Sequence, residues 1–79
     1  MKNIEILRKN LSKNIRYLRG RMTQLEIADR AGMSLATYHR IEKNQDNPCL
    51  WNIVKICCFH GISIEDILFF DLEENEKQK

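Results

Sequence analysis

Two short helices with their own start and stop signals follow one another in the first half of the chain, and this segment constrains the fold more than any other. Thr23 is a favourable N-cap residue, and Glu26 three residues later completes a capping box. Gly32 can adopt the positive φ with which many helices end, and Ser34 can cap a second helix directly after it. The segment therefore predicts a pair of helices joined by a tight turn.

The two predicted helices, at about 24–31 and 35–43, each have one apolar face. Ala28 is small, as the close approach of a second helix requires, whereas Tyr38 and Ile41 turn one face of the second helix inward. The residues expected on the opposite, outward face of the second helix are Ala36, His39, Arg40 and Lys43. This helix is therefore expected to present polar and basic groups to solvent or to a partner.

This segment resembles the helix-turn-helix of Cro and phage repressors, that is, the lambda-repressor-like or xenobiotic-response-element family. The residues that carry the resemblance are Thr23-Gln24, Ile27-Ala28, Gly32, Ser34, Thr37, Arg40-Ile41-Glu42, Asn47-Pro48, Leu50, Gly61 and Ser63. They lie in the family's order and at its distances, over roughly residues 11–68.

The resemblance implies an all-α domain of five helices, with the helix-turn-helix at the second and third. Residues 35–43 then form the recognition helix, which lies in the major groove of DNA. The resemblance also implies an ion pair between Arg19 of the first helix and Glu42. The implied function is a DNA-binding transcriptional regulator of the Cro-like repressor type. An α-hairpin without a role in DNA binding is the alternative.

The chain departs from the family pattern in two places that bear on function. Three residues separate Arg19 from Thr23, where the family usually has five, so the first connection is expected to be tighter. Leu35 and Ala36 stand where relatives often carry polar residues such as glutamine. This departure predicts fewer hydrogen bonds to bases.

The remaining helices are predicted from apolar spacing and from capping residues. A long first helix is expected, with Asn3 as its cap and Gly20 at its end; a break near residues 10–12 is the alternative. Asn47-Pro48 is predicted to begin the fourth helix, with proline in its first turn, and Ser63 to cap the fifth. The residues expected to face the core are Leu50, Ile53, Val54 and Cys57 in the fourth helix, and Ile64, Ile67 and Leu68 in the fifth.

Charge is distributed unevenly along a chain whose net charge is only +2. Residues 1–22 contain seven basic residues against Glu5, a net charge of +6, whereas residues 69–79 contain four acidic residues against two lysines, a net charge of −2. We therefore expect one DNA-binding domain over residues 1–70 and an acidic, disordered tail over residues 71–79. The basic first helix suits contact with phosphates; a solvated basic face is the alternative.

Candidate DNA contacts follow from the faces of the predicted helices. The residues expected to contact bases are Leu35, Ala36, Thr37, His39 and Arg40, and those expected to contact phosphates are Thr23, Gln24, Lys13, Arg16 and Lys43. Arg40 is the best candidate for a bidentate bond to guanine O6 and N7, whereas Leu35 or Ala36 could touch a thymine methyl group. Gln24 and the free amides at the start of its helix suit a phosphate.

Several large apolar residues lie off the predicted core faces. Trp51 and Cys58 are seven apart on one face of the fourth helix, Phe59 lies further round, and Phe69 points away from the core face of the fifth helix. These four residues are the candidate dimer interface; coverage of Trp51 by the first helix or by the tail is the alternative. The expected partners are an inverted-repeat DNA operator and a second copy of the chain. An antitoxin-type or protein-interaction module that grips a second protein, such as a toxin or an anti-repressor, is the alternative.

The sequence lacks the signatures of other functional classes. It contains no nucleophile–base motif, glycine-rich phosphate loop or cysteine and histidine spacing for a metal, so an enzyme, a cofactor and a metal site are not expected. The three cysteines are expected to be free thiols. No apolar run is long enough to span a membrane and no signal peptide is evident, so a cytoplasmic location is expected.

Overall fold

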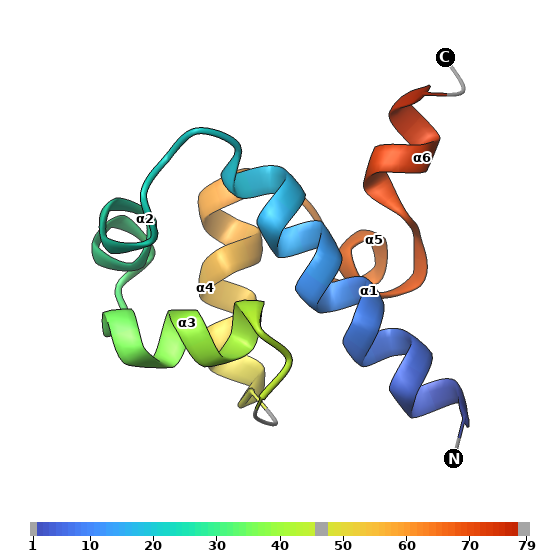
Figure 1. The fold of residues 1–79 in the computed structure, drawn as a ribbon, viewed down its shortest axis with the longest axis horizontal. Helices are drawn as coiled ribbons and strands as arrows, with labels where there is room; N and C mark the ends of the chain where they lie inside the picture. Colours follow the sequence, from blue (N-terminus) through green and yellow to red (C-terminus); the bar gives the residue numbers. More distant parts are fainter. Residues whose placement is uncertain (1, 46–47, 78–79) are drawn as a thin grey trace.

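The regular structure in the described part of the chain is entirely helical, as the sequence predicts (Figure 1). The computed structural model describes residues 2–45 and 48–77. Its six helices are α1 (Lys2–Arg19), α2 (Gln24–Ala31), α3 (Leu35–Glu42), α4 (Leu50–His60), α5 (Ile64–Phe69) and α6 (Leu72–Lys77). The bounds of α2 match the prediction, and those of α3 differ from it by one residue.

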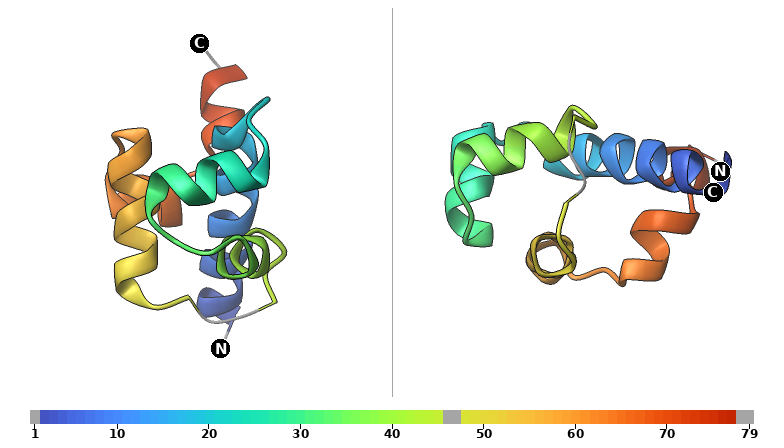
Figure 2. Two further views of the ribbon diagram at one scale, coloured as in Figure 1. Left: turned by 90° about the vertical axis from the view of Figure 1, so that its left-hand side faces the viewer. Right: turned by 90° about the horizontal axis from the view of Figure 1, so that it is seen from below.

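The helices form two layers that are best seen along the long axis of α4 (Figure 2). α1 and α3 run in one layer, and α4 and α5 lie in the other. α2 packs against both α3 and α4 and so closes one end of the domain, while α6 packs against α1 at the other end (Figure 1). The helix-turn-helix pair therefore sits at the end of the molecule opposite the C-terminal helix.

One hydrophobic core joins the first five helices. Its buried residues are Leu11, Ile15, Ile27, Ala28, Tyr38, Ile41, Ile56, Cys57 and Ile67. Leu11 and Ile15 come from the middle of α1, which runs without the break near residues 10–12 that the sequence left open. α1 begins before Asn3, so the prediction that Asn3 caps this helix is wrong.

Two asparagine side chains of α1 fix the position of α5. Asn14, itself buried, donates from Nδ2 to the carbonyl oxygens of Ile67 and Phe70, at 2.8 and 2.7 Å. Asn10 donates in the same way to the carbonyl oxygen of Leu68, at 2.9 Å. The last carbonyl groups of a helix have no partner within it, so these bonds satisfy the C-terminal end of α5.

α4 differs from its prediction in both its start and its inward face. Cys49 is the N-cap residue, so Pro48 precedes the helix instead of lying in its first turn; Asn47 lies outside the described residues. The first turn extends beyond the core, which leaves Leu50 exposed, and the fully buried residue that the prediction omitted is Ile56. Cys57 is buried as expected, and Ile53 is partly buried against the core.

A sixth helix lies where the sequence predicts a disordered tail. Asp71 Oδ1 accepts a hydrogen bond from the backbone N–H of Glu74 at 3.1 Å and so caps α6. The backbone N–H of Leu72 donates to Asn14 Oδ1 at 3.1 Å, and Lys13 pairs with Asp71. The partners that order residues 71–77 come from α1, far away in the sequence. The composition of the tail alone therefore does not reveal this helix.

Candidate nucleic-acid interface

The start of α2 is fixed by the capping box that the sequence predicts. The backbone N–H of Glu26 donates to Thr23 Oγ1 at 3.1 Å, and the backbone N–H of Thr23 donates to Glu26 Oε1 at 3.3 Å. Both bonds satisfy amides that an uncapped helix leaves without partners. The capping leaves Thr23 itself exposed at the end of α2.

The turn between α2 and α3 is fixed from both sides. Gly32 has φ of +83°, a conformation that glycine adopts without strain, and the N–H of Met33 donates to the carbonyl oxygen of Ala28 at 2.9 Å. Ser34 Oγ then accepts from the N–H of Thr37 at 3.1 Å and caps α3. Because these hydrogen bonds and the Gly32 conformation fix the backbone of the turn, they set the direction of α3 relative to α2.

A buried carboxylate ties the other end of α3 to α1 and α2. Glu42 is only 2% exposed. Arg19 of α1 donates to both of its carboxylate oxygens, from Nε to Oε2 and from Nη2 to Oε1, each at 2.9 Å. Gln24 of α2 donates from Nε2 to Oε1 at 3.0 Å. The ion pair that the family resemblance implies is therefore present, in the two-pronged geometry that arginine favours.

The protonation states of this cluster follow from its contacts. Burial by itself would raise the pKa of Glu42, but the hydrogen bonds from Arg19 and from Gln24 outweigh it and lower the pKa. Burial next to that carboxylate raises the pKa of Tyr38 well above its usual value. Glu42 is thus ionised and Tyr38 neutral at neutral pH, so Arg19 is matched by one buried negative charge.

Gln24 also reaches the outward face of α3. Its Oε1 lies 3.0 Å from Nδ1 of His39, while its Nε2 bonds to Glu42. Both ends of this amide are therefore engaged within the protein. The predicted contact of the Gln24 side chain with a phosphate stays a prediction, and it requires exchange of one of these bonds.

The predicted base-contacting residues of α3 differ in their exposure and in their hydrogen bonds. Leu35, Ala36, His39 and Arg40 are exposed. The Arg40 guanidinium makes no hydrogen bond or ion pair with any group in residues 2–45 and 48–77. Thr37 is half-buried, and its Oγ1 accepts a hydrogen bond from Ser34 Oγ at 2.8 Å. Among the polar candidates, Arg40 is thus the side chain most available to a partner.

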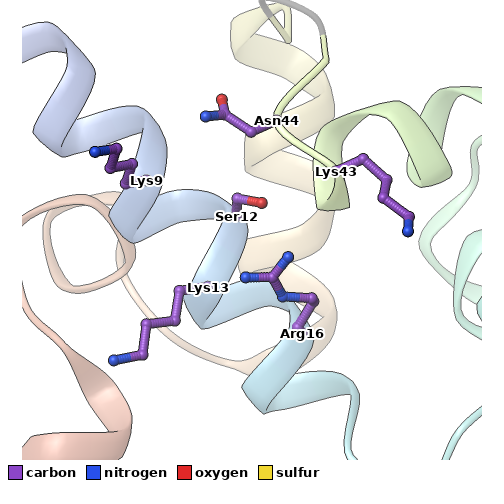
Figure 3. Close-up of a pocket in the computed structure, with 6 residues that line it drawn as sticks. All are labelled: Lys9, Ser12, Lys13, Arg16, Lys43 and Asn44. Carbon is purple, nitrogen blue, oxygen red and sulfur yellow. The ribbon is translucent and has the colours of Figure 1, made fainter.

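Basic side chains gather in a pocket between α1 and the end of α3 (Figure 3). The pocket has a volume of about 300 Å³ and is lined by Lys9, Ser12, Lys13, Arg16, Lys43 and Asn44. It brings together three of the predicted phosphate contacts, Lys13, Arg16 and Lys43. The sequence analysis omitted Lys9 as a site residue, although its spacing from Lys13 and Arg16 places all three on one face of a helix.

The basic residues of the pocket are not equally free. Arg16 donates from Nη1 to the carbonyl oxygen of Glu42 at 3.4 Å and remains largely exposed. Lys43 is exposed at the C-terminal end of α3. Lys13 is paired with Asp71, Nζ to Oδ2, at 2.6 Å. Their contacts with DNA phosphates stay predictions.

Three of the four candidate dimer residues are exposed in the structure, and the fourth is half-buried. Trp51, which is 69% exposed, and Cys58 lie on the free surface of α4, and Phe69 of α5 is 60% exposed. Trp51 is thus left uncovered by the side chains of α1 and α6 that the structure describes. Phe59 is half-buried, packs against the core and makes an edge-to-face contact with the ring of His60 at 5.0 Å between centroids. Phe59 therefore belongs mainly to the fold.

Comparison with known proteins agrees with this geometry. The sequence model of the family described as Helix-turn-helix matches residues 15–67, which include α2 and α3 and most of the core. The chain belongs to this family, of the Cro and phage-repressor type. A helix-turn-helix protein of this family is a DNA-binding transcriptional regulator, and the all-helical domain agrees with that assignment.

One relative extends the match over nearly the whole domain. A protein of Methanocaldococcus jannaschii, named as an uncharacterized HTH-type transcriptional regulator, is 38% identical over 66 residues, which cover 84% of this chain and 98% of the relative. No solved structure matches the chain.

Two further findings concern other classes of function. The described residues contain no group of histidine, cysteine and acidic side chains placed to hold a metal ion, and all three cysteines are free. None of the helices in the described ranges is long and apolar enough to cross a bilayer.

Proposed function

We propose that this helix-turn-helix protein binds double-stranded DNA in a sequence-specific way as a homodimer, with α3 of each protomer in the major groove. It then regulates transcription from an operator that is an inverted repeat. The helix-turn-helix family supplies the class of function. The operator, the mode of contact and the assembly are the parts proposed here.

The observation that carries the proposal is the contrast between the two faces of α3. The inner face is fixed by Tyr38, Ile41 and Glu42, all of which are buried. On the outer face the Arg40 guanidinium is exposed and unengaged within the described part of the chain. A planar guanidinium on a rigid helix suits a bidentate bond to guanine O6 and N7.

The basic pocket supports a second kind of contact. Arg16 and Lys43 come from α1 and from the end of α3, so they flank the recognition helix instead of lying on its reading face. Such groups suit phosphates, which fix register but carry no sequence information. Thr23 is exposed at the N-terminal end of α2, a position that also suits contact with a phosphate.

Dimerisation follows from the small size of the reading surface. α3 has eight residues, and so short a helix reads only a few base pairs. Two copies related by a twofold axis would read both halves of a palindrome. Trp51 and Phe69 are large, exposed apolar side chains of the α4 and α5 layer, and a partner seated on that layer would leave the outer face of α3 free (Figure 2).

Selection of bound duplexes from random-sequence DNA, followed by gel-shift titration, tests the proposal. The expected result is an inverted repeat with half-site centres about 10 base pairs apart, or a multiple of that spacing. The selected site should bind at least about 1,000-fold more tightly than a scrambled duplex of the same composition. A protein that shifts no duplex at low salt contradicts the proposal and favours a protein-interaction module.

A further inference from the structure

An ion pair links the basic pocket to the C-terminal segment of the chain. Lys13 Nζ lies 2.6 Å from Asp71 Oδ2, and these two residues are 58 positions apart. In Figure 3 the Lys13 side chain extends away from Ser12 and Arg16, toward the ribbon of the C-terminal segment. One of the cations that line the pocket is thus held by an anion of the protein itself.

The segment that supplies this anion is acidic and ordered against α1. Asp71 caps α6 through its other carboxylate oxygen, and the N–H of Leu72 is bonded to Asn14. The hydrogen bond that Lys13 donates to Asp71, and then the negative charges of Asp71, Glu73 and Glu74, raise the pKa of Lys13. α6 therefore presents several negative charges to the basic side of α1.

We propose that residues 71–77 act as an intramolecular competitor for the DNA backbone, with the Asp71 carboxylate occupying the position on Lys13 that a DNA phosphate takes in the complex. The inference rests on the proposed function. The inference adds a regulatory segment to that function. When DNA docks against the pocket, the Lys13 ammonium group exchanges the Asp71 carboxylate for a DNA phosphate, and the C-terminal segment is released from Lys13.

The exchange is physically accessible because the ion pair is exposed. The side chains of Lys13 and Asp71 are 44% and 32% exposed, so the pair is screened by salt and weak. Ser12 and Arg16 of the same pocket are engaged with the carbonyl oxygen of Glu42, at the C-terminal end of α3. The Lys13 side chain, which makes neither of these contacts, can exchange its partner without disturbing a buried group.

Asp71→Asn tests the exchange with little change to the fold. Asparagine remains a good N-cap residue, so α6 keeps its cap while the negative charge that faces Lys13 is removed. Glu65→Gln is the matched control, because it removes the same charge from the exposed first turn of α5. Affinities for the selected duplex and for a scrambled one are measured over a range of salt concentrations for both variants, for Lys13→Ala and for the Lys13→Ala, Asp71→Asn double variant.

The expected result is that Asp71→Asn tightens binding to both duplexes about two- to fivefold at low salt, more than Glu65→Gln does. Lys13→Ala should lower the slope of log affinity against log salt by about 0.9, and in its presence Asp71→Asn should have no larger effect than Glu65→Gln has in the wild-type protein. The proposal is overturned if Asp71→Asn and Glu65→Gln act alike, or if the gain persists without Lys13. If the wild-type protein binds no duplex, the proposed function fails first and the competitor fails with it.

Discussion

Glu42 shows how one buried side chain can join three helices. A buried carboxylate is costly unless it is paired and fully hydrogen-bonded, and Glu42 receives bonds from α1 and α2 while it sits at the end of α3. Because Gln24 bonds to both Glu42 and His39, the same cluster reaches the outer face of α3. The cluster therefore sets the orientation of α3 as well as the stability of the domain.

Glu42→Gln is expected to lower the free energy of unfolding by roughly 2–3 kcal/mol at neutral pH, because Arg19 loses its charged partner in a largely buried site. The pKa of Glu42 is lowered in the folded state, so its stabilisation is complete above the unfolded pKa of about 4.3 and is lost as the pH falls through the lower folded value. Urea titrations at pH 7 and pH 3 should therefore show the difference between wild type and variant shrinking in acid.

The control for this prediction is Glu65→Gln, which removes an exposed carboxylate of α5. Its free energy of unfolding should stay within about 0.5 kcal/mol of the wild-type value. A difference in the free energy of unfolding between wild type and Glu42→Gln that is equally large at both pH values would show that the charge of Glu42 does not contribute to stability.

Arg40→Ala is expected to cost about 1–3 kcal/mol of binding to the selected site and to relax the preference at one base pair, because the guanidinium matches the major-groove edge of guanine. Arg30→Ala is the matched control. It removes the same charge from an exposed position in the last turn of α2. An equal loss on site and scrambled DNA would mean that Arg40 holds a phosphate and reads no base.

At the scale of the helices, the elements that could be predicted from the sequence are those determined locally. α2 and α3 begin at Thr23 and Ser34 caps and are separated by Gly32, and all three signals act within a few residues. The core faces of α2, α3 and α5 follow from the same short-range periodicity. The Arg19–Glu42 pair was implied by family resemblance, since no spacing rule connects two residues 23 positions apart.

The elements that could not be predicted depend on distant partners. α6 needs Lys13 and Asn14 of α1, and the exposure of the first turn of α4 depends on how far that helix projects beyond its neighbours. The basic pocket likewise forms only when α1 packs against the end of α3. Its cations are visible in the sequence, but their convergence is a property of the packing.

Ser34→Ala is expected to destabilise the domain by about 1 kcal/mol, because the amide of Thr37 loses its bond to Ser34 Oγ. The first turn of α3 should fray, and Leu35 and Ala36 lie in that turn. Ser34→Asp, which keeps a capping oxygen and adds a charge that suits a helix N-terminus, should restore stability. Thermal unfolding measures all three proteins, and equal midpoints would show that the cap is dispensable.

At the scale of the whole molecule, the two layers separate two kinds of surface. The basic pocket and the outer face of α3 belong to the layer of α1 and α3, whereas Trp51 and Phe69 belong to α4 and α5 (Figures 1 and 2). The proposed DNA contacts and the proposed protein interface thus lie on different layers. Separate variants can therefore test the two functions independently.

The last prediction concerns assembly. Burial of Trp51 and Phe69 from two protomers would cover several hundred Å² of apolar area, which contributes on the order of 10 kcal/mol before the costs of association. The wild-type protein is therefore expected to sediment as a dimer at micromolar concentration, and Trp51→Glu as a folded monomer that binds the selected site at least about tenfold more weakly. Leu25→Glu is the matched control, because Leu25 is 62% exposed on α2 and should leave sedimentation unchanged. A wild-type protein that stays monomeric at high concentration and selects a site without an inverted repeat would rule out the dimer, because a single α3 would then account for all of the sequence preference.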